Sequence, residues 1–387
     1  MHILLIYTGE FQTKKAPIGG IFQLNQAKVL TSNKHKVGIL NPCIISPRHI
    51  FFKYDFNDYY KINSIPIYRS YKKNFYPGKL KLLNYFLREN YKKISLDLFE
   101  KYIDKNGLPD LCHVFDIRFG LTIGDEIKKK YNIPYIFTEY CVEIANNTLP
   151  LSKKYLDDHV KRQVHDADYI ALPSKAFAKK FKKFLKINKK INLLPPVLPP
   201  DLIKIKTNKN YKLKRNNFTF IIVSRIDKNK NIKVIVEAFS KIKNDKLRLK
   251  ILGNGPELNT IKKFLYDKRI LLIKKSTRLE MLKHLADSNC ILCSSYHETF
   301  GVGLIEAGWF GIPIISSKCE GPSEIVNKIN GLLVKNNTVN EFYLAMGKML
   351  DRYKKYNSNE IKKSIIKKYG HKTYINNYKK IIGKILK

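Results

Sequence analysis

The sequence predicts an α/β protein with two domains, each built on a parallel β-sheet. Short apolar runs alternate with helix-like segments along most of the 387 residues, and the pattern restarts once, after a Pro-rich stretch. Hydrophobic residues make up 44% of the chain, which is enough for a core in each of two domains of ordinary size. Buried parallel strands read as unbroken apolar runs, so this alternation favours parallel sheets.

The first half opens with a strand at residues 2–7 that ends at Gly9, and Gly19-Gly20 then precedes a helix at 21–30. With the next strand at 35–40, this is a Rossmann-like beginning. Later elements of the same half are strands at 111–115, 134–138 and 168–174, and a helix at 123–130. We therefore place a first domain at residues 1–200.

The rhythm breaks after about Leu194, where two Pro-Pro pairs are followed by Lys- and Asn-rich sequence. This composition predicts a linker at 201–216. A second domain follows at 217–365, with strands at 218–224 and 247–252 and a helix at 232–242. Because parallel sheets bind ligands beyond the carboxyl ends of their strands, we expect the chemistry in a cleft between the domains.

The charge balance is strongly basic, with 73 Lys and Arg against 32 Asp and Glu, a formal net charge of +41. Two explanations stay open: an A/T-rich coding bias, and attraction to anionic partners such as a membrane surface or nucleic acid. The charge is spread along the chain and no nucleic-acid motif accompanies it, so we expect no nucleic-acid partner.

The six cysteines form no dense disulfide framework. Cys290 and Cys293 make a C-x-x-C, but no second ligand pair follows at zinc spacing, and the run reads as a buried strand. The sequence shows no secretory signal and no run near the ~18 apolar residues of a membrane span. We expect a cytoplasmic protein, with peripheral attachment to the membrane left open.

The most informative stretch runs from Ser294 to Pro313 and contains Glu298 and Glu306 in an E-x7-E spacing. It closely resembles the donor-site signature of family 4 of the retaining glycosyltransferases, which have the GT-B fold of two Rossmann-like domains facing across a cleft. Four further elements of that family recur in order along the chain: Gly19-Gly20, Arg225-x4-Lys230, Gly253-Asn-Gly255-Pro256, and 319–334.

The resemblance implies a retaining, metal-independent enzyme that moves a sugar from a nucleotide-diphosphate donor, UDP by default, to an acceptor. Arg225 at a strand end and Lys230 after it place two cations where a diphosphate leaving group would lie. Glu298 would face the donor sugar, and Glu306 would accept hydrogen bonds from the ribose. Further donor-binding positions are Gly19, Gly20, Gly253, Gly255, Phe300, Gly301 and Val302.

The first half departs from the family pattern. Relatives often carry His-x-His and Thr-Glu-His where this chain has His113-Val-Phe115 and Thr138-Glu139-Tyr140, so donor and acceptor preference stay open. We interpret His113 as a packed core residue. Asp166-Ala-Asp168 looks like a metal-binding D-x-D but borders a core strand, so we expect no metal and no cofactor. Glu320 stands where relatives often have Gly.

The family's habits imply a glycan or lipid-linked glycan acceptor in bacterial surface polysaccharide or lipopolysaccharide assembly. They also imply that the C-terminal helix at 366–387, with Tyr374, Tyr378, Ile381 and Ile385 on one side, packs back on the first domain. Between Arg69 and Lys93, aromatic residues interleave with Lys, which fits an interfacial helix and a core-facing helix equally well. Two alternatives remain: a catalytically silent sugar-nucleotide-binding subunit, since the first half has lost two histidines, and a polyanion-binding protein, given the net charge.

Overall fold

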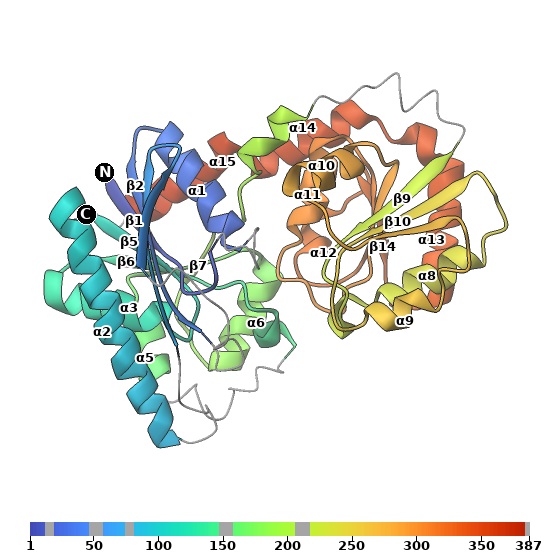
Figure 1. Ribbon diagram of the computed structural model, residues 1–387. Coiled ribbons are helices and arrows are strands. Elements are labelled where there is room, and N and C mark those ends of the chain that lie inside the picture. The colour runs from blue at the N-terminus through green and yellow to red at the C-terminus, as the bar shows by residue number, and fades with distance from the viewer. Residues whose placement is uncertain (12–18, 46–56, 74–80, 147–157, 206–216, 384–387) are drawn as a thin grey trace. The chain divides into compact units, whose positions relative to one another are not determined.

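The computed structural model describes residues 1–11, 19–45, 57–73, 81–146, 158–205 and 217–383. They divide into two compact units, Met1–Val197 with Tyr374–Lys387, and Leu198–Thr373. Each contains one β-sheet between layers of helices (Figure 1). The chain therefore has two α/β units, as the alternating pattern predicts. Of the predicted linker, only residues up to 205 lie in the described part of the chain.

The first sheet runs in the order β3-β4-β2-β1-β5-β6-β7-β8. Its strands are β1 His2–Ile6, β2 Lys36–Ile45, β3 Asn57–Ile62, β4 Ile65–Lys73, β5 Leu111–Phe115, β6 Tyr135–Thr138, β7 Tyr169–Leu172 and β8 Ile191–Leu193. All pairings are parallel except β3 with β4. That hairpin adds one antiparallel strand at the edge of the parallel sheet that the alternating pattern predicts. It turns at Asn63 and Ser64, both with positive φ (48° and 68°), as a two-residue type I′ turn requires.

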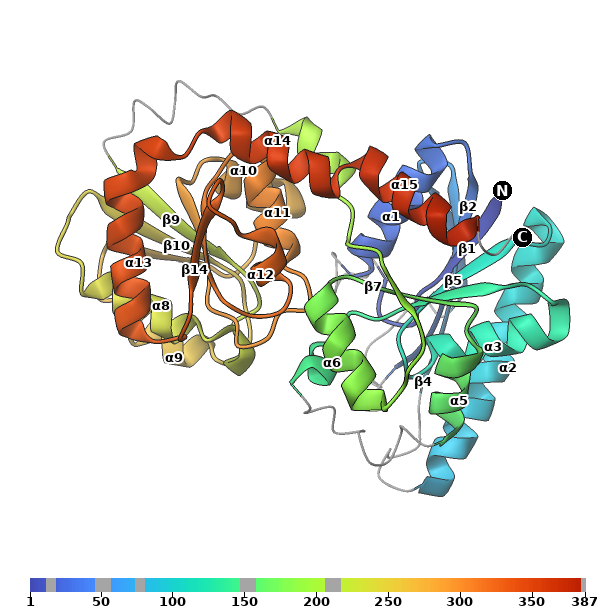
Figure 2. The ribbon, with the colours of Figure 1, turned by 180° about the vertical axis from the view of Figure 1, so that it is seen from behind.

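The helices of the first unit cover both faces of its sheet (Figures 1 and 2). They are α1 Ile21–Ser32, α2 Lys81–Asn106, α3 Gly120–Tyr131, α4 Val142–Ala145, α5 Asp158–Asp166, α6 Lys175–Leu185 and α15 His371–Ile382. Side chains of β1 alternate between two cores: Leu4 and Ile6 face one, and Ile3 and Leu5 face the other.

The second sheet runs in the order β11-β10-β9-β12-β13-β14, and its pairings are all parallel. Its strands are β9 Phe218–Val223, β10 Leu247–Leu252, β11 Ile270–Ile273, β12 Cys290–Cys293, β13 Ile314–Ser317 and β14 Gly331–Val334. Counted along the chain this is the 3-2-1-4-5-6 order of a dinucleotide-binding sheet.

The second unit's sheet is also covered on both faces, and on one of them α8 and α13 lie side by side (Figure 2). Its helices are η2 Pro200–Lys204, η3 Lys228–Lys230, α8 Ile232–Ser240, α9 Leu258–Lys262, α10 Arg278–Ala286, α11 Val302–Trp309, α12 Pro322–Ile325, α13 Val339–Arg352, η4 Tyr353–Lys355 and α14 Ser358–Tyr369.

The last helix, α15, belongs to the first unit's core although it follows the whole second unit in sequence. Tyr374, Tyr378 and Ile381 are buried against the core that contains β1 and α1. The Tyr374 hydroxyl donates to Gln26 Oε1 at 3.1 Å, and the Tyr378 hydroxyl hydrogen-bonds with His113 Nδ1 at 3.2 Å. Ile385, predicted on the same side, lies outside the described residues.

This packing predicts that Tyr378→Ala destabilises the first unit by about 3–5 kcal/mol, the usual cost of truncating a buried aromatic side chain. Hydrogen exchange would show weaker protection in β1 and β5, while β9 and β12 keep theirs. The control is Lys380→Ala on the exposed face of the same helix, which should change stability by less than about 0.5 kcal/mol. Equal protection of β1 in both variants would show that α15 does not stabilise this sheet.

Candidate functional site

The order in which strands are added to the second sheet reverses between β9 and β12. β10 and β11 extend the sheet on the β9 side, and β13 and β14 extend it on the β12 side. At such a switch point the loops that follow the two strands diverge and leave a crevice at their carboxyl ends. Arg225 and Lys230 follow β9, and Glu298 follows β12. The structure therefore brings the predicted R-x4-K and E-x7-E elements to one place.

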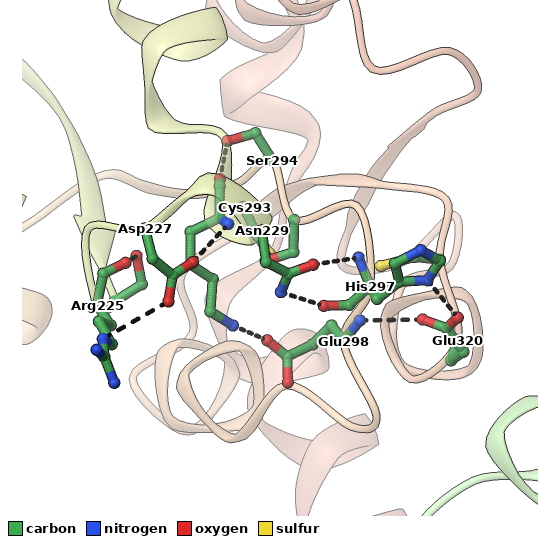
Figure 3. A network of polar contacts seen from close by, with 12 residues as sticks. Arg225, Asp227, Asn229, Cys293, Ser294, His297, Glu298 and Glu320 are labelled. Carbon is green, nitrogen blue, oxygen red and sulfur yellow. Dashed lines mark hydrogen bonds and ion pairs between the residues drawn. The ribbon is translucent and has the colours of Figure 1, made fainter. Parts of the chain in front are cut away.

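The loop after β9 holds two cations in different surroundings (Figure 3). The Arg225 side chain is 71% exposed, and its Nε lies 3.7 Å from Asp227 Oδ2. Asp227 also caps the short helix η3, since its carboxylate accepts from the Lys230 backbone N–H at 3.1 Å. A pocket of about 320 Å³ opens beside this loop and is lined in part by Asp227, Lys228 and Tyr296.

Lys230 is mostly buried, with 19% of its side chain exposed, and forms an ion pair with Glu298, the first carboxylate of the E-x7-E motif. Burial acts to lower the pKa of Lys230, but Glu298 and Asp227 outweigh it and leave that pKa above its ordinary value. Lys230 is therefore a fixed, permanently charged ammonium group at the switch point.

Hydrogen bonds join the loops after β9 and β12 along their length (Figure 3). Asn229 donates through Nδ2 to the His297 carbonyl at 2.9 Å and accepts through Oδ1 from the His297 N–H at 3.1 Å. Its own carbonyl accepts from Tyr296 N–H at 2.8 Å. The Ser294 hydroxyl lies 2.8 Å from the Lys230 carbonyl. The position of Glu298 opposite Lys230 is thus set by the backbone.

Glu320, the departure from the family's usual Gly, is buried behind the Glu298 loop. One carboxylate oxygen accepts from the Glu298 backbone N–H at 2.9 Å, and the other lies 3.0 Å from His297 Nδ1. The Gly321 N–H then donates to the Glu298 carbonyl at 2.8 Å. Glu320 therefore supports the loop that carries Glu298.

The glycine turn after β10 packs directly on the loop after β9. A Cβ atom on Gly253 would lie 1.9 Å from the Ser224 carbonyl oxygen, and one on Gly255 would lie 2.2 Å from that of Ile226. The backbone bonds from Ser224 N–H to Leu252 O (3.1 Å) and from Ile226 N–H to Asn254 O (3.0 Å) hold this contact. Gly253 and Gly255 thus allow the Arg225 loop to approach closely.

Helix α11 begins at Val302 after Gly301, whose φ of 104° strongly favours glycine. Phe300, just before the turn, is buried and packs edge-to-face on Tyr369 with ring centroids 5.3 Å apart. The first N–H groups of a helix lack partners within the helix, so this end favours an anion. The start of α11 lies four residues after Glu298 in sequence.

Glu306 lies within α11 and is 3% exposed. Its Oε1 accepts from Arg278 Nη2 at 2.6 Å, and Arg278 is also paired with Asp201, with Nε 3.1 Å from Oδ2. Burial raises the pKa of Glu306, and Arg278 opposes that rise. The two carboxylates of the E-x7-E motif therefore have separate cationic partners.

Gly19 and Gly20 lie in the first unit. Gly20 precedes α1 with a φ of 66°, and a Cβ there would lie 2.1 Å from Phe11 Cδ2, so the turn needs glycine. The first sheet has its own switch point between β1 and β5. There the Thr8 hydroxyl donates to Asp116 Oδ2 at 2.7 Å.

The residues that replace the family's histidines are packed among aromatic and amide groups. Phe115 stacks on His113 with ring centroids 4.3 Å apart, and the Tyr140 hydroxyl accepts from Gln26 Nε2 at 3.0 Å. His113 is fully buried, and burial lowers its pKa to about 3. It is therefore neutral at physiological pH, as the interpretation of a packed residue requires.

Glu139 is a buried carboxylate at the end of β6 that accepts three backbone N–H groups. They come from Ile117 at 2.7 Å and from Tyr140 and Cys141 at 2.8 Å each. Burial and the neighbouring Asp116 raise the pKa of Glu139 to about 7, against the lowering effect of those bonds. Glu139 therefore fixes the loops after β5 and β6.

Two other sequence candidates are part of the packing. Cys290 and Cys293 are the first and last residues of the strand β12, and Cys290 is fully buried. The Asp168 carboxylate of the D-x-D bonds Lys128 Nζ at 2.6 Å and the Tyr135 N–H at 3.0 Å. Cys290 and Asp168 therefore take part in the packing of their sheets.

No helix in the described part of the chain is long and apolar enough to cross a membrane. Within the Lys- and aromatic-rich segment, residues 74–80 are outside the described ones. In the following helix α2, Leu87 and Leu98 are buried, whereas Phe86 is 49% exposed. Helix α2 therefore has a core-facing side and at least one exposed aromatic ring.

Sequence reasoning missed Asn229, Arg278 and Asp201 as parts of the site. Asn229 lies inside the R-x4-K element, directly before Lys230, and this position in the motif could have marked it as part of the site. Arg278 and Asp201 are 77 residues apart and carry no motif, so only the fold brings them together.

The comparisons with known proteins agree with this architecture. Residues 204–367 match the family model of glycosyl transferases group 1. The chain is 26% identical over 404 residues to a probable sucrose-phosphate synthase of Thermosipho melanesiensis, covering 96% of this chain and 92% of that protein. It is 30% identical over 150 residues to the UDP-Gal:alpha-D-GlcNAc-diphosphoundecaprenol alpha-1,3-galactosyltransferase of Escherichia coli, covering 36% and 38% of the two chains.

Among solved structures, the sucrose-phosphate synthase of Thermosynechococcus elongatus superposes with a TM-score of 0.77 at 15% identity, covering 100% of this chain and 99% of that one. This likeness shows the fold, which is GT-B. Taken with the family match, the chain has the GT-B fold, and residues 204–367, which lie in its second unit, carry a group 1 glycosyl transferase domain.

Proposed function

We propose that the chain transfers a sugar from a nucleoside diphosphate donor, UDP by default, to a glycan or lipid-linked glycan acceptor with retention of configuration. The observation that carries this proposal is the Lys230–Glu298 pair at the switch point of a dinucleotide-type sheet. A cation fixed there suits a departing diphosphate, and a carboxylate beside it suits the hydroxyls of the sugar.

The donor diphosphate is bound by Arg225 and Lys230. Arg225 is exposed and only loosely paired, so its guanidinium is able to turn toward two phosphate oxygens, whereas the mostly buried Lys230 supplies a fixed point charge. Backbone N–H groups at Gly301 and Val302 add partial positive charge at the start of α11. Together these groups stabilise the charge that develops on the leaving group.

The remaining donor contacts follow from the same placement. Glu298 faces the donor sugar, and buried Glu306 accepts hydrogen bonds from the ribose hydroxyls. The close-packed turn at Gly253 and Gly255 and the buried Phe300 shape the donor pocket. Gly19 and Gly20 contribute from the first unit.

The transfer step needs no protein nucleophile. The bond between the sugar's anomeric carbon and the diphosphate oxygen breaks, and the acceptor oxygen bonds to that carbon on the same face. The acceptor's proton passes to an oxygen of the departing diphosphate. The charges of Arg225 and Lys230 take the part that a metal ion has in other glycosyltransferases, so we propose a metal-independent reaction.

We place acceptor binding in the first unit and donor binding in the second. A relative that acts on a diphosphoundecaprenol-linked sugar supports a lipid-linked acceptor, and the net charge of +41 suits an anionic membrane surface. Under this proposal the protein works at the inner face of the cytoplasmic membrane in bacterial surface polysaccharide or lipopolysaccharide assembly.

Arg225→Ala should lower kcat/KM for sugar transfer by about 10²–10³, since it removes one stabilising contact to the leaving group. Because the side chain is exposed, the melting temperature should stay unchanged. Lys228→Ala removes an exposed cation of the same loop and serves as the control, with near-normal transfer. Near-normal transfer in Arg225→Ala as well would contradict the diphosphate assignment.

One nucleoside diphosphate among UDP, GDP, ADP and CDP should stabilise the protein selectively, and we expect UDP. At a concentration 100 times the Kd the gain is about 2.7 kcal/mol, which thermal-shift titration detects easily. The shift should vanish in Arg225→Ala and persist in Lys228→Ala. A protein that no diphosphate stabilises would fit neither a transferase nor a silent nucleotide binder.

Replacing Lys79, Lys81, Lys92 and Lys93 by Gln should reduce cosedimentation with anionic vesicles, because each charge near such a surface contributes about 1 kcal/mol. Hydrolysis of a soluble donor should not change. A variant with Lys179, Lys182, Lys183 and Lys190 replaced provides a charge-matched control elsewhere on the first unit. Equal loss of vesicle binding in both variants would indicate attraction by net charge alone, without a docking segment.

A further inference from the structure

Arg278 connects two carboxylates that are far apart in sequence. Its Nη2 donates to Glu306 Oε1 at 2.6 Å, while Nε and Nη2 form two bonds to Asp201, at 3.1 and 3.4 Å. The side chain is 22% exposed, against 24% for Asp201 and 5% for Glu306. The three groups therefore form a largely buried network of one cation and two anions.

The position of Arg278 is defined by the local structure. It is the first residue of α10, directly after Thr277, whose side chain forms a capping box with Glu280. The double contact with Asp201 then prevents rotation of the planar guanidinium group. Arg278 thus presents Nη2 to Glu306 from a fixed direction.

Glu306 needs this partner to remain ionised. A carboxylate that is buried without a cation tends to take up a proton, because desolvation penalises its charged form. Burial does raise the pKa of Glu306, and Arg278 acts against it. A protonated Glu306 would carry an O–H donor in place of one of its acceptor sites, and would accept hydrogen bonds less strongly without its charge.

The contact with Arg278 occupies only one of the two carboxylate oxygens of Glu306. Arg278 bonds Oε1, and within the described part of the chain no donor is recorded for Oε2. An ionised carboxylate held by one oxygen presents the other in a defined direction, which suits a ligand hydroxyl.

We propose that Arg278 is a positioning residue for nucleotide recognition, which keeps Glu306 ionised and aims its Oε2 at the ribose hydroxyls. This inference rests on the proposed ribose role of Glu306. Asp201 compensates the charge of the guanidinium group and holds it in place. The alternative is that the network only ties η2 to α10 and α11, without an effect on ligand choice.

The test compares ligands that differ only at the ribose. Isothermal titration with UDP, with 2′,3′-dideoxy-UDP and with inorganic diphosphate gives three dissociation constants for each variant. In the wild type we expect UDP to bind about ten- to a hundredfold more tightly than its dideoxy analogue, the range of a hydrogen bond to a charged group. Inorganic diphosphate reports the phosphate contacts alone.

In Glu306→Gln and in Arg278→Met the ratio between UDP and its dideoxy analogue should fall to within about threefold of one. Binding of inorganic diphosphate should stay within about twofold of wild type in both. Arg278→Lys, which keeps the charge without the fork, should recover part of the ratio. Arg269→Met is the matched control: it breaks another Arg–Asp pair, with Asp267, just before the edge strand β11. It should keep the full ratio.

The outcomes separate this inference from the proposed function. A full ratio in Arg278→Met together with a lost ratio in Glu306→Gln would overturn the role of Arg278 and leave the ribose assignment intact. A full ratio in Glu306→Gln would remove the ribose assignment itself. If Arg278→Met does not fold, Arg278→Met combined with Asp201→Asn removes the unpaired charge of Asp201, and the same ratio decides.

Discussion

The ion pair between Lys230 and Glu298 is the interaction on which the rest of the site depends. It joins the loops that follow β9 and β12, the two strands between which the strand order of the sheet reverses. The surrounding hydrogen bonds of Asn229 and Glu320 hold both loops in the conformation that makes this pair. The crevice formed by the strand order thereby acquires a fixed charge pattern before any donor arrives.

Local sequence patterns were sufficient for the parts of the fold that local physics determines. Largely apolar runs of four to six residues marked the central strands β9 and β12, since a strand covered on both faces has no polar side. The β3–β4 hairpin was not predicted, because its turn uses Asn63 and Ser64 in a left-handed conformation instead of glycine. Two adjacent turn residues that include neither Gly nor Pro are only a weak sequence signal for a turn.

The candidate site divides in the same way. Arg225, Lys230, Glu298 and Glu306 stand out because charged residues follow apolar strands or lie in glycine-rich, apolar sequence. The partners that determine their ionisation and direction could not be predicted, since Arg278 meets Asp201 and Glu306 only through long-range packing. Glu320 was visible as an unusual residue, but its hydrogen bond to the Glu298 backbone needed coordinates.

Helix α15 has a consequence for synthesis on the ribosome. The first unit is begun before the second, yet part of its buried surface is supplied by Tyr374, Tyr378 and Ile381, which are translated only after the whole of Leu198–Thr373. Domains usually fold as units in the order of their synthesis. Here the second unit is able to complete its core before α15 is made. Until then the apolar residues of β1 and α1 that contact α15 remain exposed, and chaperones are able to bind them.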